Sequence, residues 1–258
     1  MPTLTLDSMW VVTKRLARSS MEDTAALAAS LGGTLPHSHR AFLERFGAGS
    51  FVGVLRVLGP AEILAQRDLV REHRVFAPEH AKVWPDFAGL VNANEAERLV
   101  PVAVSIDGDM LTVNLDRPDM LFVFPRHRED IELAEDFTEA LGWFSHSGSY
   151  WERSKKPWFE SHVGRVEHEV HLTGAGDPYE SISHLLDDLP PDHEGVELNP
   201  SNELFYVDGD VVVQWIGKST FRVRTDESAC DAFLARFTES LARAGFQATV
   251  TRQKHPFF

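Results

Sequence analysis

The side chains best suited to chemistry in this sequence are its histidines and a single cysteine, Cys230. His168 and His171 are three residues apart, and on a strand that spacing places two side chains on opposite faces, so they cannot chelate one metal ion. Cys230 falls inside a helical pattern near Phe233, which is typical of a small buried apolar residue. One cysteine cannot form an internal disulfide or a Cys-based zinc site. We therefore predict no metal site and no cofactor.

Motifs for phosphate binding and nucleophilic catalysis are absent from the sequence. It has no Gly-x-x-x-x-Gly-Lys-Ser/Thr loop and no Gly-x-Ser-x-Gly elbow. The Gly-rich stretch at residues 47–50 follows a predicted helix, so it does not offer the amide groups of a helix N-terminus to a phosphate. Asp107 and Asp109 are two carboxylates at a hairpin tip, but nothing around them separates their pKa values as acid–base catalysis requires. These observations predict a protein that is not an enzyme.

Composition and charge narrow the range of partners. The 258 residues include 25 Lys and Arg against 39 Asp and Glu, which gives a formal net charge of −14. An acidic chain lacks the basic surface that nucleic-acid binding needs, and no apolar run approaches the roughly 18 residues of a membrane span. The N-terminus has no basic segment before an apolar stretch. We expect a cytoplasmic protein that binds neither nucleic acid nor membrane.

The first half of the sequence predicts alternating helices and strands. Ser20 is a suitable N-cap for a helix that ends at Gly32, and Pro36 suits the first position of a second helix. Residues 51–58 predict one strand, and a charged helix follows from residue 61 towards residue 75. The buried stripe of the second helix is expected to comprise Phe42, Leu43 and Phe46.

Near residue 100 the apolar residues begin to alternate with polar or small ones, which predicts a sheet. Apolar residues alternate over 100–106 and 111–115, and the intervening Asp107-Gly108 is a strong signal for a hairpin turn. A third strand covers 120–124. One face of a closing helix is then expected to carry Phe137, Ala140, Leu141 and Phe144.

Residues 145–157 are rich in Ser and Gly and end in Pro157, which indicates a connector. We place a first domain at residues 1–148 and a second at 149–258. Strands are predicted over 166–172, 203–207, 211–216, 221–225 and 246–251, with helices over 179–189 and 226–244. Trp151 in the connector and Trp158 just after it predict packing between the two domains; the alternative is an exposed anchor for a partner.

The order of motifs resembles the SUKH superfamily of bacterial immunity proteins and fungal cell-wall regulators. The matching segments are the Leu-Pro-x-x-x-Arg-x-Phe-Leu stretch within 35–49, the Gly-Asp hairpin at 107–109, Val123-Phe124 and the Asp-Phe-x-x-x-Leu pattern at 136–141. The family often has Tyr where His39 stands. The resemblance covers residues 20–144. It implies an α+β fold with a mixed sheet flanked by helices, followed here by a second, smaller α+β domain.

The resemblance also implies a non-catalytic protein-binding function, most readily that of an immunity protein that neutralises a toxin by direct binding. A basic toxin such as a nuclease would be attracted by the acidic surface. The first candidates for contact residues are Asp107, Asp109, Asp130 and Glu132, which are expected to reach solvent. Two alternatives stay open: a regulatory scaffold without a toxin, and an enzyme with a site at the domain junction. The oligomeric state is not predicted.

Overall fold

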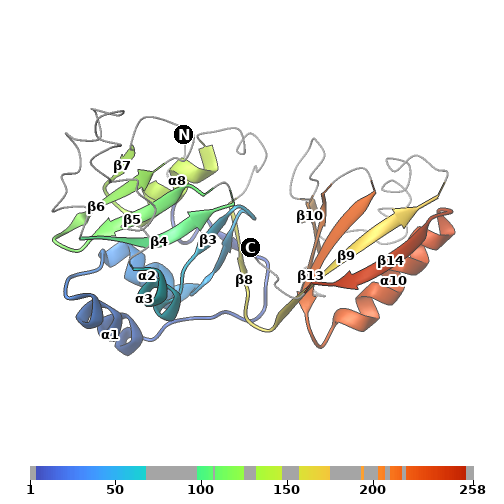
Figure 1. The fold of residues 1–258 in the computed structure, drawn as a ribbon, viewed down its shortest axis with the longest axis horizontal. Helices are drawn as coiled ribbons and strands as arrows, with labels where there is room; N and C mark the ends of the chain where they lie inside the picture. Colours follow the sequence, from blue (N-terminus) through green and yellow to red (C-terminus); the bar gives the residue numbers. More distant parts are fainter. Residues whose placement is uncertain are drawn as a thin grey trace. The chain divides into compact units, whose positions relative to one another are not determined.

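The chain forms two compact units in a computed structural model that describes residues 4–67, 98–106, 108–124, 132–146, 157–174, 193–194, 203–206, 210–216 and 219–253 (Figure 1). The first unit comprises Met1–Met9, Leu16–Trp151 and Pro157–Ser161. The second comprises Trp10–Arg15, Glu152–Lys156 and His162–Phe258. Each contains helices and an antiparallel sheet, so the predicted α+β class is confirmed. No helix in the described ranges is long and apolar enough to cross a membrane.

The first helix, α1 (Met21–Leu31), begins and ends as its sequence predicts. The Asp23 amide donates to Ser20 Oγ at 3.1 Å, and the Ser20 amide donates to Asp23 Oδ2 at 2.8 Å. This reciprocal pair satisfies two amides that the helix itself leaves unpaired. Gly32 then ends the helix in the left-handed conformation, with φ of 67°.

A proline marks the start of each of the next two helices. Helix α2 (His37–Arg45) begins one residue later than predicted, and Pro36, the predicted first helical residue, is its N-cap. Helix α3 (Pro60–Gln66) begins with the proline itself, and Glu62 Oε2 accepts from the Gly59 amide at 2.8 Å. The predicted continuation of this helix beyond residue 67 lies outside the described residues.

Strands of the first unit follow the order β8-β2-β3-β4-β5-β6-β7, and each neighbouring pair is antiparallel. A further helix, α8 (Phe137–His146), corresponds to the predicted closing helix. A two-residue strand, β1 (Trp10–Val11), belongs to a segment grouped with the second unit. The strands of the first unit are β2 (Gly49–Phe51), β3 (Leu55–Val57), β4 (Leu99–Ser105), β5 (Met110–Asn114), β6 (Arg117–Phe124), β7 (Glu132–Ala134) and β8 (Trp158–Ser161).

The expectation of one strand over residues 51–58 is wrong. Phe51 pairs with Leu55, and the chain reverses between them through Val52, with φ of 46°, and Gly53, with φ of 74°. Two successive residues with positive φ form a tight turn. Only Gly53 carries a sequence signal for it, because a β-branched residue such as Val52 rarely adopts that conformation.

Strand β8 follows directly after the predicted connector and belongs to the first unit. Its residues pair with β2, Phe51 lying opposite Phe159, and Trp158 and Phe159 are buried. The predicted division at residue 148 assigns this segment to the second domain, whereas the structure groups Pro157–Ser161 with the first unit. Trp151 lies outside the described residues.

The core of the first unit is a cluster of phenylalanine rings. Phe42 lies 5.1 Å from Phe46, 5.0 Å from Phe137 and 5.4 Å from Phe159 between ring centroids. These contacts join α2, α8 and β8. Edge-on arrangements at such distances add attraction beyond simple burial. The predicted core residues Phe42, Leu43, Phe137 and Leu141 are all fully buried, which confirms that prediction.

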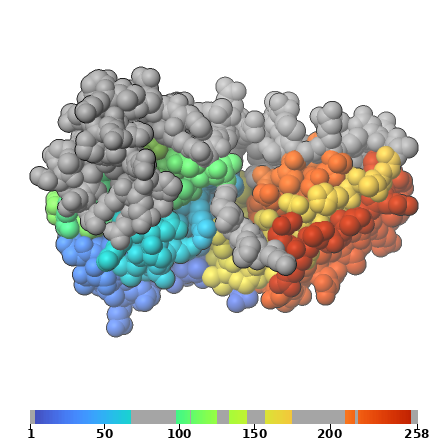
Figure 2. Space-filling model, viewed as in Figure 1, coloured from blue at the N-terminus to red at the C-terminus, as the bar shows by residue number. Residues whose placement is uncertain are grey.

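The second unit is a six-stranded antiparallel sheet in the order β10-β11-β12-β13-β9-β14, with α10 (Cys230–Arg243) on one face (Figure 1). Phe233, Phe237 and Leu241 of α10 pack on the sheet. Residues of β9 and β14, gold and red in Figure 2, lie at the surface of this unit. The strands are β9 (Arg165–Thr173), β10 (His193–Glu194), β11 (Glu203–Tyr206), β12 (Val211–Trp215), β13 (Thr220–Asp226) and β14 (Gln247–Arg252).

Five predicted strands of the second half correspond to β9, β11, β12, β13 and β14, each within two residues at either end. The helix predicted to start at residue 226 begins only at Cys230, because β13 extends to Asp226 and a turn follows it. Asp226 Oδ1 accepts from the Ser228 amide at 2.9 Å within that turn. The helix predicted over residues 179–189 lies outside the described residues.

Candidate functional site

The structure describes the side chain of only one of the four predicted contact residues. Asp107 and Asp130 lie outside the described residues. Glu132 begins β7, and the structure describes its backbone but not its side chain. Asp109 immediately precedes strand β5, and the structure describes both its backbone and its side chain. The predicted role of Asp107, Asp130 and Glu132 as contact residues therefore stays a prediction.

Asp109 differs from the expectation that its side chain reaches solvent. The residue is only 9% exposed, and its Oδ2 accepts from Ser105 Oγ at 2.7 Å. The Asp109 amide donates to the same Ser105 Oγ at 2.9 Å, and the Ser105 amide donates to the Asp109 carbonyl at 2.8 Å. These bonds close the turn between β4 and β5. The Asp109 carboxylate thus stabilises the hairpin from within, and the expectation of an exposed side chain is wrong.

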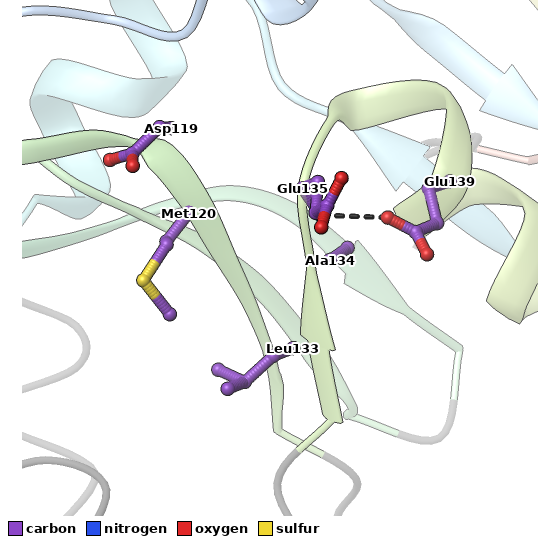
Figure 3. A pocket seen from close by; sticks show the side chains of 6 residues that line it. All are labelled: Asp119, Met120, Leu133, Ala134, Glu135 and Glu139. Atoms are coloured by element: carbon purple, nitrogen blue, oxygen red, sulfur yellow. Dashed lines mark hydrogen bonds between the residues drawn. The ribbon is translucent and has the colours of Figure 1, made fainter.

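A pocket lies beside β6, β7 and the start of α8, one residue from the predicted contact residue Glu132. Its volume is about 640 Å³, within the usual range of small-ligand sites. Figure 3 shows Asp119 and Met120 of β6 on one side and Glu135 and Glu139 on the other, with Leu133 of β7 below them in the view. Ala134 completes the lining. The lining therefore combines three carboxylates with apolar side chains.

The N-terminus of α8 fixes the acidic side of this pocket. Asp136 caps the helix, and its Oδ1 accepts from the Glu139 amide at 2.8 Å. Glu139 Oε2 in turn accepts from the Glu135 amide at 2.7 Å, the bond drawn in Figure 3. Carboxylates in the first turn of a helix are stabilised by the positive end of the helix dipole. Glu139 is thereby held on the pocket wall although it is exposed.

The apolar side of the pocket comes from the two neighbouring strands. Leu133 of β7 is 44% exposed, and it pairs across the strands with Phe122 of β6. Met120 lies two residues before Phe122 on the same face of β6, and the Arg117 guanidinium contacts its sulfur. A leucine this exposed is one of few large apolar residues at the surface of the described part of the chain. It offers an apolar contact that a binding partner can cover.

This arrangement suits a cation carried on an aliphatic stem. A lysine or arginine side chain can lay its methylene groups on Met120 and Leu133 and present its charged end to the carboxylates. An arginine can also make bidentate hydrogen bonds with a carboxylate such as Asp119 or Glu135. The pocket chemistry therefore favours a basic segment of a protein.

Sequence reasoning missed this pocket for a physical reason. Strand β7 has three residues and follows a polar stretch, so no alternating pattern marks it. Without β7, nothing indicates that Asp119 lies across from Glu135 and Glu139. The available signal was the density of acidic residues between 130 and 139 beside the apolar Leu133.

The one cysteine lies beside a histidine in the second unit. Cys230 Sγ is 3.5 Å from His168 Nδ1, and both residues are buried. Burial, with a smaller effect from Asp231, raises the pKa of the Cys230 thiol. Burial also lowers the pKa of His168. Both shifts favour the neutral forms, the opposite of the thiolate–imidazolium state of a catalytic Cys–His pair.

Charged side chains on the second sheet pair with each other. Arg165 Nη1 lies 2.8 Å from Asp210 Oδ1, and its Nη2 donates to the Arg224 carbonyl at 3.0 Å, which ties β9 to its neighbours. Arg222 Nε lies 3.3 Å from Glu167 Oε1 on the adjacent strand. Among the described residues, no group of three His, Cys, Asp or Glu side chains could hold a metal ion. These charges stabilise strand pairing.

Comparisons of the chain with protein-family models, with curated proteins and with solved structures find no match.

Proposed function

We propose that this protein is a non-catalytic protein-binding protein, and that the acidic pocket of its first unit receives a basic side chain of its partner. The observation that carries the proposal is the combination of Asp119, Glu135 and Glu139 around the exposed Leu133. Charge alone would only keep the protein soluble. Carboxylates arranged around an apolar contact give a place where a partner can be recognised.

The charge of the whole chain supports the same partner chemistry. A formal net charge of −14 attracts a basic protein over a long range, which raises the association rate before any contact forms. The pocket then supplies the short-range contacts. We propose a toxin as the partner, because residues 20–144 resemble the SUKH superfamily and its immunity proteins. A nuclease toxin fits best, since its cleft must be basic to hold phosphate groups.

Binding to a defined peptide tests the pocket without knowledge of the natural partner. We expect a Lys-Leu-Lys-Leu peptide to shift the methyl NMR signals of Met120 and Leu133, and a Glu-Leu-Glu-Leu peptide to leave them unchanged. The variant D119N/E135Q/E139Q should lose the response, because it removes the pocket charges while keeping the side-chain shapes. If the basic peptide leaves these methyl signals unchanged, the pocket is not a cation site.

A matched variant separates the pocket from the overall charge. E22Q/D231N/E239Q also neutralises three exposed acids, so both triple variants carry a formal net charge of −11. We expect this control to bind the basic peptide nearly as well as the natural sequence. If both variants lose binding equally, net charge alone explains the interaction. Genome neighbourhood then distinguishes an immunity protein from a regulatory scaffold, since an immunity gene lies beside its toxin gene.

A further inference from the structure

Strand β14 is an edge of the second sheet and is open to solvent. Among the described strands it pairs only with β9. Five of its six residues are exposed, and the sixth, Ala248, is partly buried. Its sequence, Gln-Ala-Thr-Val-Thr-Arg, is rich in β-branched residues, which favour extended structure. Exposed edges of this kind are the usual templates for pairing with another strand.

The register shows which backbone groups of β14 point away from the sheet. The Gln253 amide donates to the Glu167 carbonyl at 2.9 Å, which identifies these opposite residues as a hydrogen-bonded pair. Hydrogen-bonded and non-hydrogen-bonded pairs alternate in an antiparallel ladder. Thr249 and Thr251 therefore bond to β9, while the N–H and C=O groups of Ala248, Val250 and Arg252 point outward.

The edge carries little that would prevent pairing. Natural edge strands are protected by lysine, proline, a bulge or an inward-pointing charge. From residue 247 to residue 251, β14 has no charged residue and no proline. Arg252 is the single charge of the strand, and its Nη2 lies 2.8 Å from Glu227 Oε1. The pairing edge is thus nearly neutral in a strongly acidic chain, so two copies can approach here without strong repulsion.

We propose that β14 pairs with β14 of a second copy of this chain, antiparallel about a two-fold axis at Val250. This register places Val250 opposite Val250 and Ala248 opposite Arg252 of the other copy. Each outward N–H and C=O of the three residues then finds a partner, which gives six hydrogen bonds. Thr249 lies opposite Thr251, a favourable cross-strand pair. The two Arg252 residues lie at opposite ends of the paired strands, so their charges stay apart.

The choice of a second copy over another protein rests on this self-complementarity. Shifting the axis to Thr249 or Thr251 leaves one of the outward-pointing residues of each copy without a partner. Only the axis at Val250 uses Ala248, Val250 and Arg252 together. A C₂ interface requires a surface that complements itself in this way. The proposal is independent of the pocket in the first unit, and either can fail without the other.

Charge variants at Val250 test both the pairing and its register. By sedimentation velocity we expect the natural protein to shift from monomer to dimer mass as its concentration rises. V250K and V250E should each lose the dimer, because like charges would face each other across the axis. An equimolar mixture should regain it, since Lys then faces Glu. Val250 is 39% exposed, so at a concentration where the natural protein is monomeric both variants should keep its thermal midpoint.

A surface control completes the experiment. Ile106 is 45% exposed in the first unit, so I106K makes the same kind of change away from β14 and should leave the dimer intact. A natural protein that stays monomeric at the highest soluble concentration would overturn the proposal. A dimer that persists in both V250K and V250E, or variants that do not recombine on mixing, would overturn it equally. A monomer whose β14 captures an extended segment of another protein would also contradict it.

Discussion

His39 is the most unusual residue of the first unit. It is fully buried on α2, and neither Nδ1 nor Nε2 has a hydrogen-bond partner within the described part of the chain. Its ring packs 4.9 Å from that of Phe137. Burial lowers the pKa of His39 to about 3. The imidazole is therefore neutral in the folded protein, where it serves as an aromatic core residue.

This burial links the stability of the fold to pH. Between pH 6.5 and about 3 the unfolded chain binds a proton at His39 that the folded chain does not. The free energy of unfolding therefore falls as the pH falls through this window, by up to about 1.4 kcal/mol per pH unit for one such group. We expect His39→Phe to remove this contribution. Urea unfolding at pH 7, 6 and 5 should show a shallower slope in the variant, and equal slopes would contradict the burial of a neutral imidazole.

The sequence predicted which residues of α2 are buried, but it did not predict the burial of Asp109 or the residues of the pocket. The spacing of Phe42, Leu43 and Phe46 identified the buried face of α2, because a helix repeats every 3.6 residues. The same reasoning did not identify Asp109 as buried. An Asp-Gly pair indicates a turn, but the bond between Asp109 and Ser105 depends on how the hairpin closes. The pocket residues Asp119 and Glu139 could not be associated, since only the fold brings them to one surface.

At the scale of the elements, α2, α8 and β8 are held together through Phe42. Its ring contacts Phe46 at the end of the same helix, and also Phe137 and Phe159, which come from segments far apart in the sequence. Truncation removes all three contacts and leaves a cavity. We expect Phe42→Ala to lower the free energy of unfolding by roughly 3–5 kcal/mol. Urea denaturation measures this change; an unaltered midpoint would refute the proposed core.

Gly47, just after α2, lies close to the backbone of Ala17, and this contact can be tested by substitution. Its φ is 78°, and a Cβ at this position would lie 1.8 Å from the Ala17 carbonyl oxygen. Gly32 has a similar φ of 67°, but a Cβ there would meet nothing within 4 Å. Gly32→Ala should therefore cost about 1–2 kcal/mol, for the left-handed conformation alone. Gly47→Ala should cost more, and thermal unfolding that ranks the two variants the other way would contradict this packing.

The elements that the sequence predicted are those with a strong local pattern. The segments of β4 and β5 alternate in sequence, β6 ends in an apolar run, and Ser20 with Asp23 marks the start of α1. Strand β8 was missed because its stability comes from pairing with β2, which is distant in sequence. The turn at Val52 was missed because valine is not a turn-forming residue. Long-range pairing and local strain leave little trace in a short window of sequence.

Across the whole chain, negative charge acts on a basic partner both at long range and in direct contact. The net charge of −14 should speed encounter with a basic partner, and the pocket should hold the complex once formed. Salt weakens the first effect, because the Debye length falls from about 10 Å at 0.1 M to about 3 Å at 1 M. We expect the association rate to fall several-fold over that range. A rate independent of salt would remove electrostatic steering from the account.

Binding of the two triple variants to the natural partner, once it is isolated by pull-down from the native cell, shows whether the pocket is the binding site. D119N/E135Q/E139Q and E22Q/D231N/E239Q have the same net charge, so steering affects them equally. We predict similar association rates for both in surface plasmon resonance, and a dissociation rate at least tenfold faster for the pocket variant alone. Equal dissociation rates for the two variants would contradict the pocket as the binding site.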